Sequence, residues 1–345
     1  MNSSPSRRHT DVTSQLVNAA QAGDHAAFTA LVEPHRRELH IHSYRMLGSH
    51  EDAEDAVQDT LLRAWTRIST YSGASTFRAW LYGIATNACL DQLRRRKSRV
   101  WPTEVSVATD PRLDPAQPQD LPWLEPYPTA LLAAAGMVDP GPEVMYTSKE
   151  TIELAFLAAI QHLPPRQRAV LILRDVLDWS AKDVASTLDT TPTAVNSALQ
   201  RAHATLAARM PDRGSWPRRS TADERVLLDR LIIAWEQADA DALVELLAPD
   251  TRYVMPPRPT WYSGRTDVEA FFRHHVFGQL DADWRLVPTG ANHQPAFGLY
   301  MRPRSQSAFH PFGVGVMQLS PEGIKEIAMF NSPTLFELFA LPPSA

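Results

Sequence analysis

The chain has 345 residues, a formal net charge of −5 at pH 7 and a single cysteine. This length exceeds that of one ordinary domain and indicates two or three, each able to bury a core. A single cysteine excludes an internal disulfide and any metal site built from several cysteines. The N-terminus lacks an apolar signal segment, and no apolar run approaches the roughly 20 residues that span a bilayer, so we expect a cytoplasmic protein.

Charge is distributed unevenly along the chain. Residues 1–100 carry 13 basic and 10 acidic side chains, and residues 151–220 carry 9 and 6. Residues 101–150 carry 2 basic and 8 acidic side chains, and residues 221–345 carry 10 and 15. Two mildly basic modules are therefore separated by an acidic linker and followed by an acidic domain. A basic excess suits a polyanionic partner, but this excess is too small to predict tight DNA binding by the free chain.

Residues 12–97 are predicted to form a helical module. Between Ala53 and Ala64, apolar side chains recur at the i, i+3, i+4, i+7 spacing of a buried stripe, and the opposite face is acidic. A turn follows, in which Ser75 or Thr76 is placed to cap the next helix. An acidic face around an exposed leucine suits docking on a basic protein surface, although a solvated helix face has the same pattern.

The next helix, residues 76–97, combines aromatic and basic side chains. It contains Trp80 and Tyr82, and five cations follow between residues 94 and 99. Aromatic rings beside a basic patch stack on unpaired bases, while Arg and Lys hold phosphates. Burial in the core is the competing interpretation for Trp80. Cys89 falls in the apolar pattern of this helix, so we expect a small buried residue there.

Residues 98–148 are predicted to form an acidic, proline-rich linker. Nine prolines and little periodicity predict a mostly extended or disordered segment. Residues 123–132 read Trp-Leu-Glu-Pro-Tyr-Pro-Thr-Ala-Leu-Leu, which is too aromatic for a solvated spacer. We expect this part of the linker to dock on a domain.

Residues 149–210 are predicted to be helical and to end in a helix-turn-helix. Ser180 and Asp183 resemble a capping box, and Thr191 with Pro192 marks the start of the last helix after a short turn. A second helix with a polar exposed face is typical of a reader of the DNA major groove. The exposed polar residues of the last helix are predicted to be Thr193, Asn196, Ser197, Gln200 and Arg201.

Residues 221–345 are predicted to form an α+β domain. A helix from Val226 to Ala238 precedes alternating, aromatic-rich runs at 251–255, 308–319 and 324–331. Runs of this kind, bounded by Pro and Gly, indicate strands.

Two long motifs in the helical modules resemble a known family. They are Asp-Ala-Glu-Asp-x-x-Gln-Asp from Asp52, and Trp-Leu-Tyr-x-Ile-Ala-x-Asn-x-x-Leu-Asp-x-Leu-Arg-Arg from Trp80. Residues 24–97 resemble the σ2 domain, and residues 149–210 the σ4 domain, of extracytoplasmic-function (group IV, sigma-70 family) RNA polymerase sigma factors. This resemblance implies an all-α σ2 helical bundle and an all-α helix-turn-helix σ4 domain.

The resemblance also implies roles for individual residues. The first motif would contact the β′ coiled coil of core RNA polymerase through Asp52, Glu54, Asp55, Gln58, Asp59 and Leu62. The second would melt and read the −10 element, with Asn87 at the family's position in a loop that holds a flipped base. The implied −10 residues are Trp80, Tyr82, Asn87, Arg94, Arg95, Arg96 and Lys97. The σ4 domain would touch the β flap and read the −35 element through Thr193, Asn196, Ser197, Gln200 and Arg201.

Two features qualify this assignment. The exposed face around Asn196 lacks the arginines often found in the family, and because Asn and Gln favour adenine edges, the promoter need not match the usual motif. The acidic linker would follow the RNA path of the polymerase cleft in place of RNA, or serve only as a flexible tether.

Residues 221–345 resemble the SnoaL-like, NTF2-like domain fused to some of these sigma factors, which implies a conical barrel around a pocket. Segments 253–257, 261–264 and 335–343 carry the resemblance. The predicted pocket residues are Tyr253, Met255, Trp261 and Phe271.

Two functions compete for this domain. A regulatory domain would contact σ2 or σ4 and tune polymerase engagement in place of a separate anti-sigma factor. The alternative is a small-molecule-binding domain or a cyclase- or isomerase-like enzyme with an aspartate base. The candidate bases are Asp250, Asp267, Asp281 and Asp283, with His274, His275 and Tyr253 nearby in sequence. Each acid fits a helix cap or surface turn better than a pocket, so we favour regulation.

The sequence therefore predicts an alternative sigma factor that is not an enzyme and uses no catalytic residue, metal or cofactor. Adjacent histidines such as His274 and His275 cannot place both rings on one helical face to bind a metal. The expected partners are core RNA polymerase, promoter DNA and, within the chain, σ2 or σ4 against the C-terminal domain. We expect no membrane contact and a monomer when free. A plain helix-turn-helix repressor is disfavoured because it has no need for residues 51–97.

Overall fold

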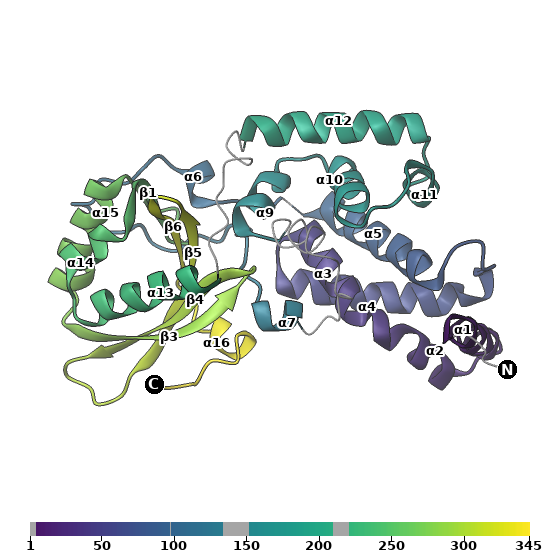
Figure 1. The fold of residues 1–345 in the computed structure, drawn as a ribbon, viewed down its shortest axis with the longest axis horizontal. Coiled ribbons are helices and arrows are strands. Elements are labelled where there is room, and N and C mark those ends of the chain that lie inside the picture. The colour runs from purple at the N-terminus through teal and green to yellow at the C-terminus, as the bar shows by residue number, and fades with distance from the viewer. Residues whose placement is uncertain (1–4, 97, 134–151, 210–220) are drawn as a thin grey trace. The chain divides into compact units, whose positions relative to one another are not determined.

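The computed structural model describes residues 5–96, 98–133, 152–209 and 221–345, and they divide into two compact units (Figure 1). Among the described residues, the N-terminal unit contains those up to Ser98 together with His162–Thr205. The C-terminal unit contains the described residues of Arg99–Gln161 and Leu206–Ala345. Most of the predicted linker is therefore grouped with the C-terminal domain. Within the described ranges, no helix is both long enough and apolar enough to cross a membrane.

The N-terminal unit is helical, as predicted. Thr76 caps α5 by accepting a hydrogen bond from the backbone N–H of Ala79, and Ser180 caps α11 in the same way through Asp183. The main helices are α1 (Pro5–Gln21), α2 (His25–Val32), α3 (Arg36–Leu47), α4 (His50–Arg67), α5 (Phe77–Arg95), α10 (Pro165–Leu171), α11 (Ala181–Thr187) and α12 (Pro192–Arg209). Short helical turns are η1 (Glu33–His35), η2 (Ile68–Thr70) and η3 (Ile172–Val176).

The apolar faces of α1 to α5 meet in one core. Val57, Leu81 and Ala85 are fully buried at its centre, in accord with the predicted stripes. Cys89 is also fully buried, as expected. Trp179, from the segment before α11, packs against the edge of this core.

The C-terminal unit is built on a six-stranded sheet in the order β2-β1-β6-β5-β4-β3. Strands β1 and β6 are parallel, and the other neighbours are antiparallel. The strands are β1 (Leu247–Val254), β2 (Trp261–Ser263), β3 (Ala282–Ala291), β4 (Gln294–Pro303), β5 (His310–Ser320) and β6 (Gly323–Phe330). The helices are α6 (Pro102–Val105), α7 (Thr129–Ala133), α9 (Leu154–Gln161), α13 (Thr221–Glu236), α14 (Ala240–Glu245), α15 (Arg265–Phe271), the π-helical η5 (Phe272–Gln279) and α16 (Leu335–Leu338).

Aromatic side chains fill the space between this sheet and its helices. Trp235 of α13 meets Phe272 edge to face, with ring centroids 4.8 Å apart, and contacts Phe297 of β4 at 5.7 Å. Figure 1 shows α13, α14 and α15 together beside the sheet. The α+β class and the runs predicted as strands are confirmed, and they correspond to β1, β5 and β6. The sequence analysis missed β2, β3 and β4.

The linker lies along the C-terminal domain rather than in solvent. The backbone N–H of Thr109 donates to the carbonyl oxygen of Trp261 at 2.8 Å, and that of Gln119 donates to Pro257 at 3.0 Å. Trp123 is 7% exposed, and Tyr127 is 2% exposed. The predicted extended conformation and the docking of the aromatic segment are both found. Disorder is wrong for residues 98–133, because this domain satisfies backbone groups that water would otherwise have bound.

Buried histidines make the N-terminal bundle sensitive to acid. Burial, followed by the charge of Arg45, lowers the pKa of His42 to about 3. Below an unfolded pKa of about 6.5, the unfolded chain takes up a proton that the folded chain does not, so stability falls as pH drops. We expect His42→Gln, which preserves a partner for Thr86, to reduce the stability lost between pH 7 and pH 5 by about 2 kcal/mol.

The measurement is native-state hydrogen exchange of the α3 amides at both pH values, corrected for intrinsic exchange rates. His310→Gln, at an exposed position in β5, is the matched control and should leave the α3 amides unchanged. An equal pH dependence in wild type and His42→Gln would contradict the assignment.

Candidate functional site

Some acidic side chains of α4 form ion pairs with arginines of the same chain. Asp52 was predicted to point outward, but it is 6% exposed and forms an ion pair with Arg96. It lies in the first helical turn after the Ser49 cap, where the N-terminal end of the helix favours negative charge. The outward position predicted for Asp52 is therefore wrong.

Other acids of α4 also have internal partners. Glu54 accepts from the guanidinium of Arg36 at 2.7 Å, and Asp59 pairs with Arg63 at 2.7 Å. Burial raises the pKa of Glu54, but hydrogen bonds from Arg36 and Gln58 outweigh burial and hold it below the ordinary value. Both carboxylates are only partly exposed.

The outward face of α4 is formed by three of the predicted residues. Asp55 and Gln58 are exposed, and Leu62 is an exposed apolar side chain at 63%. Asp55, Gln58 and Leu62 are spaced at i, i+3 and i+7, which places them on one side of the helix. We call these three residues the α4 face. It offers one carboxylate and one apolar anchor to a partner.

The two aromatic residues predicted to stack on bases differ in exposure. Trp80 is half-buried and packs near Tyr71 and Phe77, with ring centroids 5.3 and 5.6 Å away. Tyr82 is 2% exposed, and its ring lies 6.1 Å from that of Trp179, edge to face. Burial raises the pKa of the Tyr82 hydroxyl. Tyr82 is therefore covered in this conformation and is not available for stacking.

Asn87 lies within helix α5 and not in a loop, which corrects the predicted setting for a flipped base. Its side-chain amide donates to the carbonyl oxygen of Gly83 one turn earlier at 3.0 Å. The residue is exposed. It can reach nucleic acid only from the helix surface.

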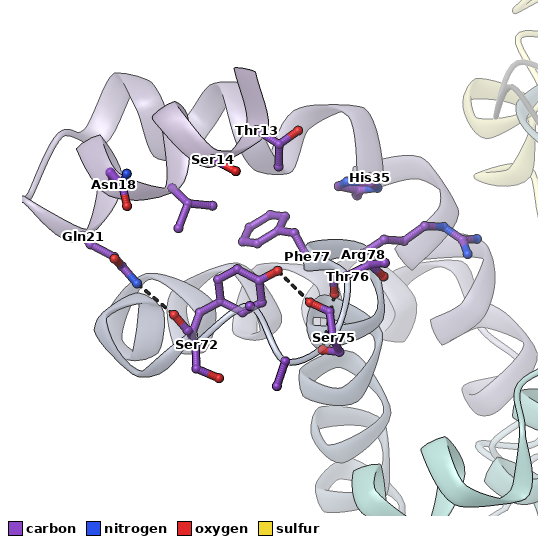
Figure 2. A pocket seen from close by; sticks show the side chains of 14 residues that line it. Thr13, Ser14, Asn18, Gln21, His35, Ser72, Ser75, Thr76, Phe77 and Arg78 are labelled. Carbon is purple, nitrogen blue, oxygen red and sulfur yellow. Dashed lines mark hydrogen bonds between the residues drawn. The ribbon is translucent and has the colours of Figure 1, made fainter. Parts of the chain in front are cut away.

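A groove that the sequence analysis missed lies beside the turn before α5. Figure 2 shows side chains of α1 facing those of the turn across this groove. Gln21 donates to the carbonyl oxygen of Tyr71 at 2.9 Å, and the Tyr71 hydroxyl donates to the carbonyl oxygen of Ser75 at 2.7 Å. These two hydrogen bonds fix the turn that forms one side of the groove. Side-chain hydroxyls and amides come from Thr13, Ser14, Asn18, Gln21, Ser72, Ser75 and Thr76. The rest of the lining comes from Val17, His35, Tyr71, Gly73, Ala74, Phe77 and Arg78.

The basic end of α5 is also partly paired. Arg94 lies 3.1 Å from Asp91, and Arg96 is bound to Asp52. Arg95 is exposed beside them. Lys97, also predicted to contact DNA, lies outside the described residues. The end of the helix presents positive charge, though less than the sequence alone suggests.

The predicted reading face of the helix-turn-helix is open. Thr193, Asn196, Gln200 and Arg201 on α12 are exposed, and Ser197 is half-buried. The hydroxyl of Thr191 accepts from the backbone N–H of Ala194, as expected for the N-cap.

A buried arginine joins the helix-turn-helix segment to the α1–α5 bundle. Arg168 of α10 is 0% exposed, and its guanidinium donates to the carbonyl oxygen of Met46, at the end of α3, at 2.5 Å. Burial lowers its pKa to about 10, so it remains charged at neutral pH. The two segments are thus held together within one unit in this conformation.

The predicted pocket residues of the C-terminal domain belong to its core, with one exception. Tyr253, Met255 and Phe271 are buried in the aromatic interior. The exception, Trp261, is half-buried, and its ring N–H donates to the carbonyl oxygen of Ser106 in the linker at 3.0 Å. Trp261 therefore contacts the linker, and the pocket role predicted for it stays a prediction.

The candidate catalytic acids lie at the surface. Asp250 pairs with Lys325, Asp283 accepts from Arg302 at 2.8 Å, and Asp281 lies 3.5 Å from Arg304. Hydrogen bonding from Lys325 holds the pKa of Asp250 below its usual value, and Arg302 does the same for Asp283. Asp267 lies in the first turn of α15.

The adjacent residues His274 and His275 have different surroundings. His275 is 6% exposed, and its ring nitrogen Nε2 lies 3.1 Å from the carbonyl oxygen of Pro111 in the linker. His274 contacts the Gln279 side chain at 3.1 Å.

Comparison with known families agrees with this architecture. Residues 31–99 match the family Sigma-70 region 2, residues 153–206 match Sigma-70, region 4, and residues 228–304 match the SnoaL-like domain. The ECF RNA polymerase sigma factor SigG of Mycobacterium tuberculosis (strain ATCC 25618 / H37Rv) is 41% identical over 321 residues, which cover 92% of this chain and 84% of SigG. SigM of the same strain is 30% identical over 200 residues, covering 58% of this chain and 85% of SigM.

The chain therefore belongs to the extracytoplasmic-function (ECF) RNA polymerase sigma factors. It is an alternative sigma factor that directs transcription, and sigma factors of this family interact with RNA polymerase and promoter DNA. The crystal structure of Mycobacterium tuberculosis SigJ has the same fold, with a TM-score of 0.57 at 20% identity over 89% of this chain and 97% of that one.

If the α4 face contacts core polymerase, removing its apolar side chain should weaken binding. Because Leu62 is exposed, we expect Leu62→Ala to leave stability within about 0.5 kcal/mol of wild type. Loss of an apolar anchor at an interface should weaken binding to core polymerase by roughly fivefold to thirtyfold. The measurement is a binding titration with labelled core enzyme.

Val226→Ala is the matched control, since Val226 is 59% exposed on α13 of the other unit. Asp55→Asn should weaken binding in the same direction and more strongly at low salt. Unchanged affinity in both α4 variants would remove this face from the polymerase interface.

Proposed function

We propose that the C-terminal domain regulates this sigma factor by holding its linker and the start of region 4. The observation that carries the proposal is the pairing of linker backbone groups with this domain, at Thr109, Gln119 and Tyr127. Chain that is bound there is withheld from polymerase. The domain thereby takes the place of a separate anti-sigma factor.

A regulatory role fits this domain better than a catalytic one. The interior is lined by aromatic and aliphatic side chains, and the candidate acids Asp250, Asp281 and Asp283 are paired with cations at the surface. A general base needs a position within hydrogen-bond reach of a bound substrate. Linker residues Pro111 and Ser106 contact His275 and Trp261, where entry of a substrate would displace them.

We further propose how the regions meet polymerase and promoter. The α4 face docks on the β′ subunit, and region 4 touches the β subunit while the exposed polar residues of α12 read the −35 element. Exposed Asn196 and Gln200 suit adenine edges, and Arg201 suits guanine or phosphate. Region 2 reads the −10 element after polymerase has shared the energetic cost of strand separation.

The groove beside the turn before α5 is proposed to receive an unpaired base of the −10 element. Hydroxyl and amide groups from Asn18, Ser72 and Thr76 offer donors and acceptors, and the half-buried Tyr71 offers an aromatic ring. Arg78 at its edge suits the adjoining phosphate. This assigns to the turn the role that the family resemblance had implied for Asn87.

Filling this groove tests the assignment. Ala74 is exposed in its lining, so we expect Ala74→Trp to lower affinity for single-stranded −10 DNA about tenfold within the polymerase complex. Ser69→Trp, at an exposed position outside the lining, is the control for added bulk. Binding of core enzyme should be unchanged in both variants. Equal DNA affinity in the two variants would show that bases bind elsewhere.

Regulation is tested by run-off transcription with core RNA polymerase on DNA from upstream of the chain's own gene. Full-length protein is compared with a chain ending near Ser220. Initiation at one start site with different yields supports regulation, and equal yields contradict it. For the enzymatic alternative, an Asp→Asn change that abolishes a turnover while leaving transcription intact would favour catalysis.

A further inference from the structure

The turn between β3 and β4 has an unusual composition and conformation. Asn292 and His293 form a two-residue hairpin connection in which both residues have positive φ angles, of 56° and 58°. Asn292 is 0% exposed even though it lies at a hairpin tip. Hairpin tips normally face water, so a buried polar side chain there indicates that something is bound against it.

Two separate segments of the chain are bound there. The Asn292 side-chain oxygen accepts from the backbone N–H of Tyr127 at 2.8 Å, and its backbone N–H donates to the carbonyl oxygen of Tyr127 at 2.8 Å. Its side-chain N–H donates to the carbonyl oxygen of Ile152 at 2.8 Å. One asparagine therefore bonds to the end of the linker and to the start of region 4.

Gln294 extends this arrangement. Its side-chain oxygen accepts from the backbone N–H of Leu154 at 3.0 Å, and its side-chain nitrogen donates to the carbonyl oxygen of Met317 at 3.3 Å. Gln294 thus anchors the first residue of α9 to the sheet. We call Asn292 and Gln294, with the backbone groups of residues 127, 152 and 154 that they bind, the clamp.

The closed clamp limits the length of chain that connects regions 2 and 4. Residues 127 and 152 meet on a single side chain, so the 24 residues between them add no separation between their ends. Fully extended, 24 residues would reach roughly 80 Å. Opening the clamp makes that length available between regions 2 and 4.

Promoter recognition requires regions 2 and 4 to separate. Elements centred near −10 and −35 are about 25 base pairs apart, or roughly 85 Å along the duplex at about 3.4 Å per base pair. In the present conformation, region 4 instead packs on region 2 through Arg168, and Trp179 covers Tyr82. The two regions cannot read separated elements while they pack in this way.

We propose that the clamp is a length switch through which the C-terminal domain restrains the sigma factor. This inference rests on the proposed regulatory function and adds its location and sign. Closed, the clamp shortens the connection between regions 2 and 4. Binding of core polymerase to the linker competes with the clamp and opens it, and transcription then proceeds.

Hydrogen exchange on the full-length chain tests the clamp directly. Asn292→Gly accommodates the positive φ angle and removes both side-chain bonds, so the Tyr127 and Leu154 amides should exchange about tenfold faster or more. Leu154 is informative because its own acceptor, Gln294, is unchanged. Asn292→Asp retains the acceptor for Tyr127 and loses the donor to Ile152, so it should release mainly the region 4 side.

His293→Asn is the matched control, since asparagine also tolerates the left-handed conformation at this position. It should leave both amides as slow as in wild type. Amides in the centre of the sheet should stay protected in every variant, which separates opening of the clamp from unfolding. Faster exchange at Tyr127 alone in Asn292→Gly would overturn the idea that one side chain couples the two segments.

The functional measurement is run-off transcription together with exchange of wild-type protein bound to core polymerase. We expect a several-fold higher yield from Asn292→Gly than from wild type or His293→Asn, and loss of protection at Tyr127 and Leu154 on polymerase binding. Retained protection in the polymerase complex, or an unchanged yield from an opened clamp, would overturn the switch. If the chain ending near Ser220 still differs from full length in yield, the regulatory function survives that result.

Discussion

Pairing of the linker backbone with the C-terminal domain is the interaction on which the rest of the structure depends. An extended, proline-rich segment cannot satisfy its own N–H and C=O groups, and it is ordered only where another surface supplies partners. Here those partners are the β1–β2 connection, near Trp261, and the β3–β4 turn at Asn292. The same turn also binds Ile152, so one site on the sheet holds both the end of the linker and the start of region 4.

Polar and aromatic groups of the N-terminal unit also find partners within the chain. Groups suited to polymerase or DNA are in several cases already engaged inside it. Asp52 neutralises Arg96, and Trp179 covers Tyr82. Within the described residues, this unit therefore offers DNA fewer free charges and rings than its sequence suggests, and we expect weak binding to DNA in the absence of polymerase.

Sequence patterns predicted much of this architecture. Helical periodicity and capping residues located α4, α5 and α12, because those signals lie within one turn of the chain. Strands β3 and β4 were missed because Pro288, Pro295 and Pro303 interrupt the alternation, even though a hairpin turn lies between them. The Asn-His pair at that turn was the available signal, but it is weaker than Asn-Gly.

Residue exposure was predicted less well than residue type. Asp52 and Tyr82 lie in motifs whose composition suggests a surface site, yet both are buried. Asp52 pairs with Arg96, 44 positions away, and Tyr82 packs against Trp179 of region 4. Contacts over such separations leave no periodic trace in the sequence. The same applies to Asn292, whose partners lie 165 and 140 residues earlier.

The single thiol of the chain also has a practical consequence. Cys89 is enclosed in α5, and burial raises its pKa to about 12, so almost none of it is thiolate at neutral pH. Cysteines introduced at the surface would therefore be the only accessible thiols for maleimide labelling, and Cys89 need not be replaced. Dye pairs placed in regions 2 and 4 would report directly, in single molecules, on how far apart the two regions move during initiation.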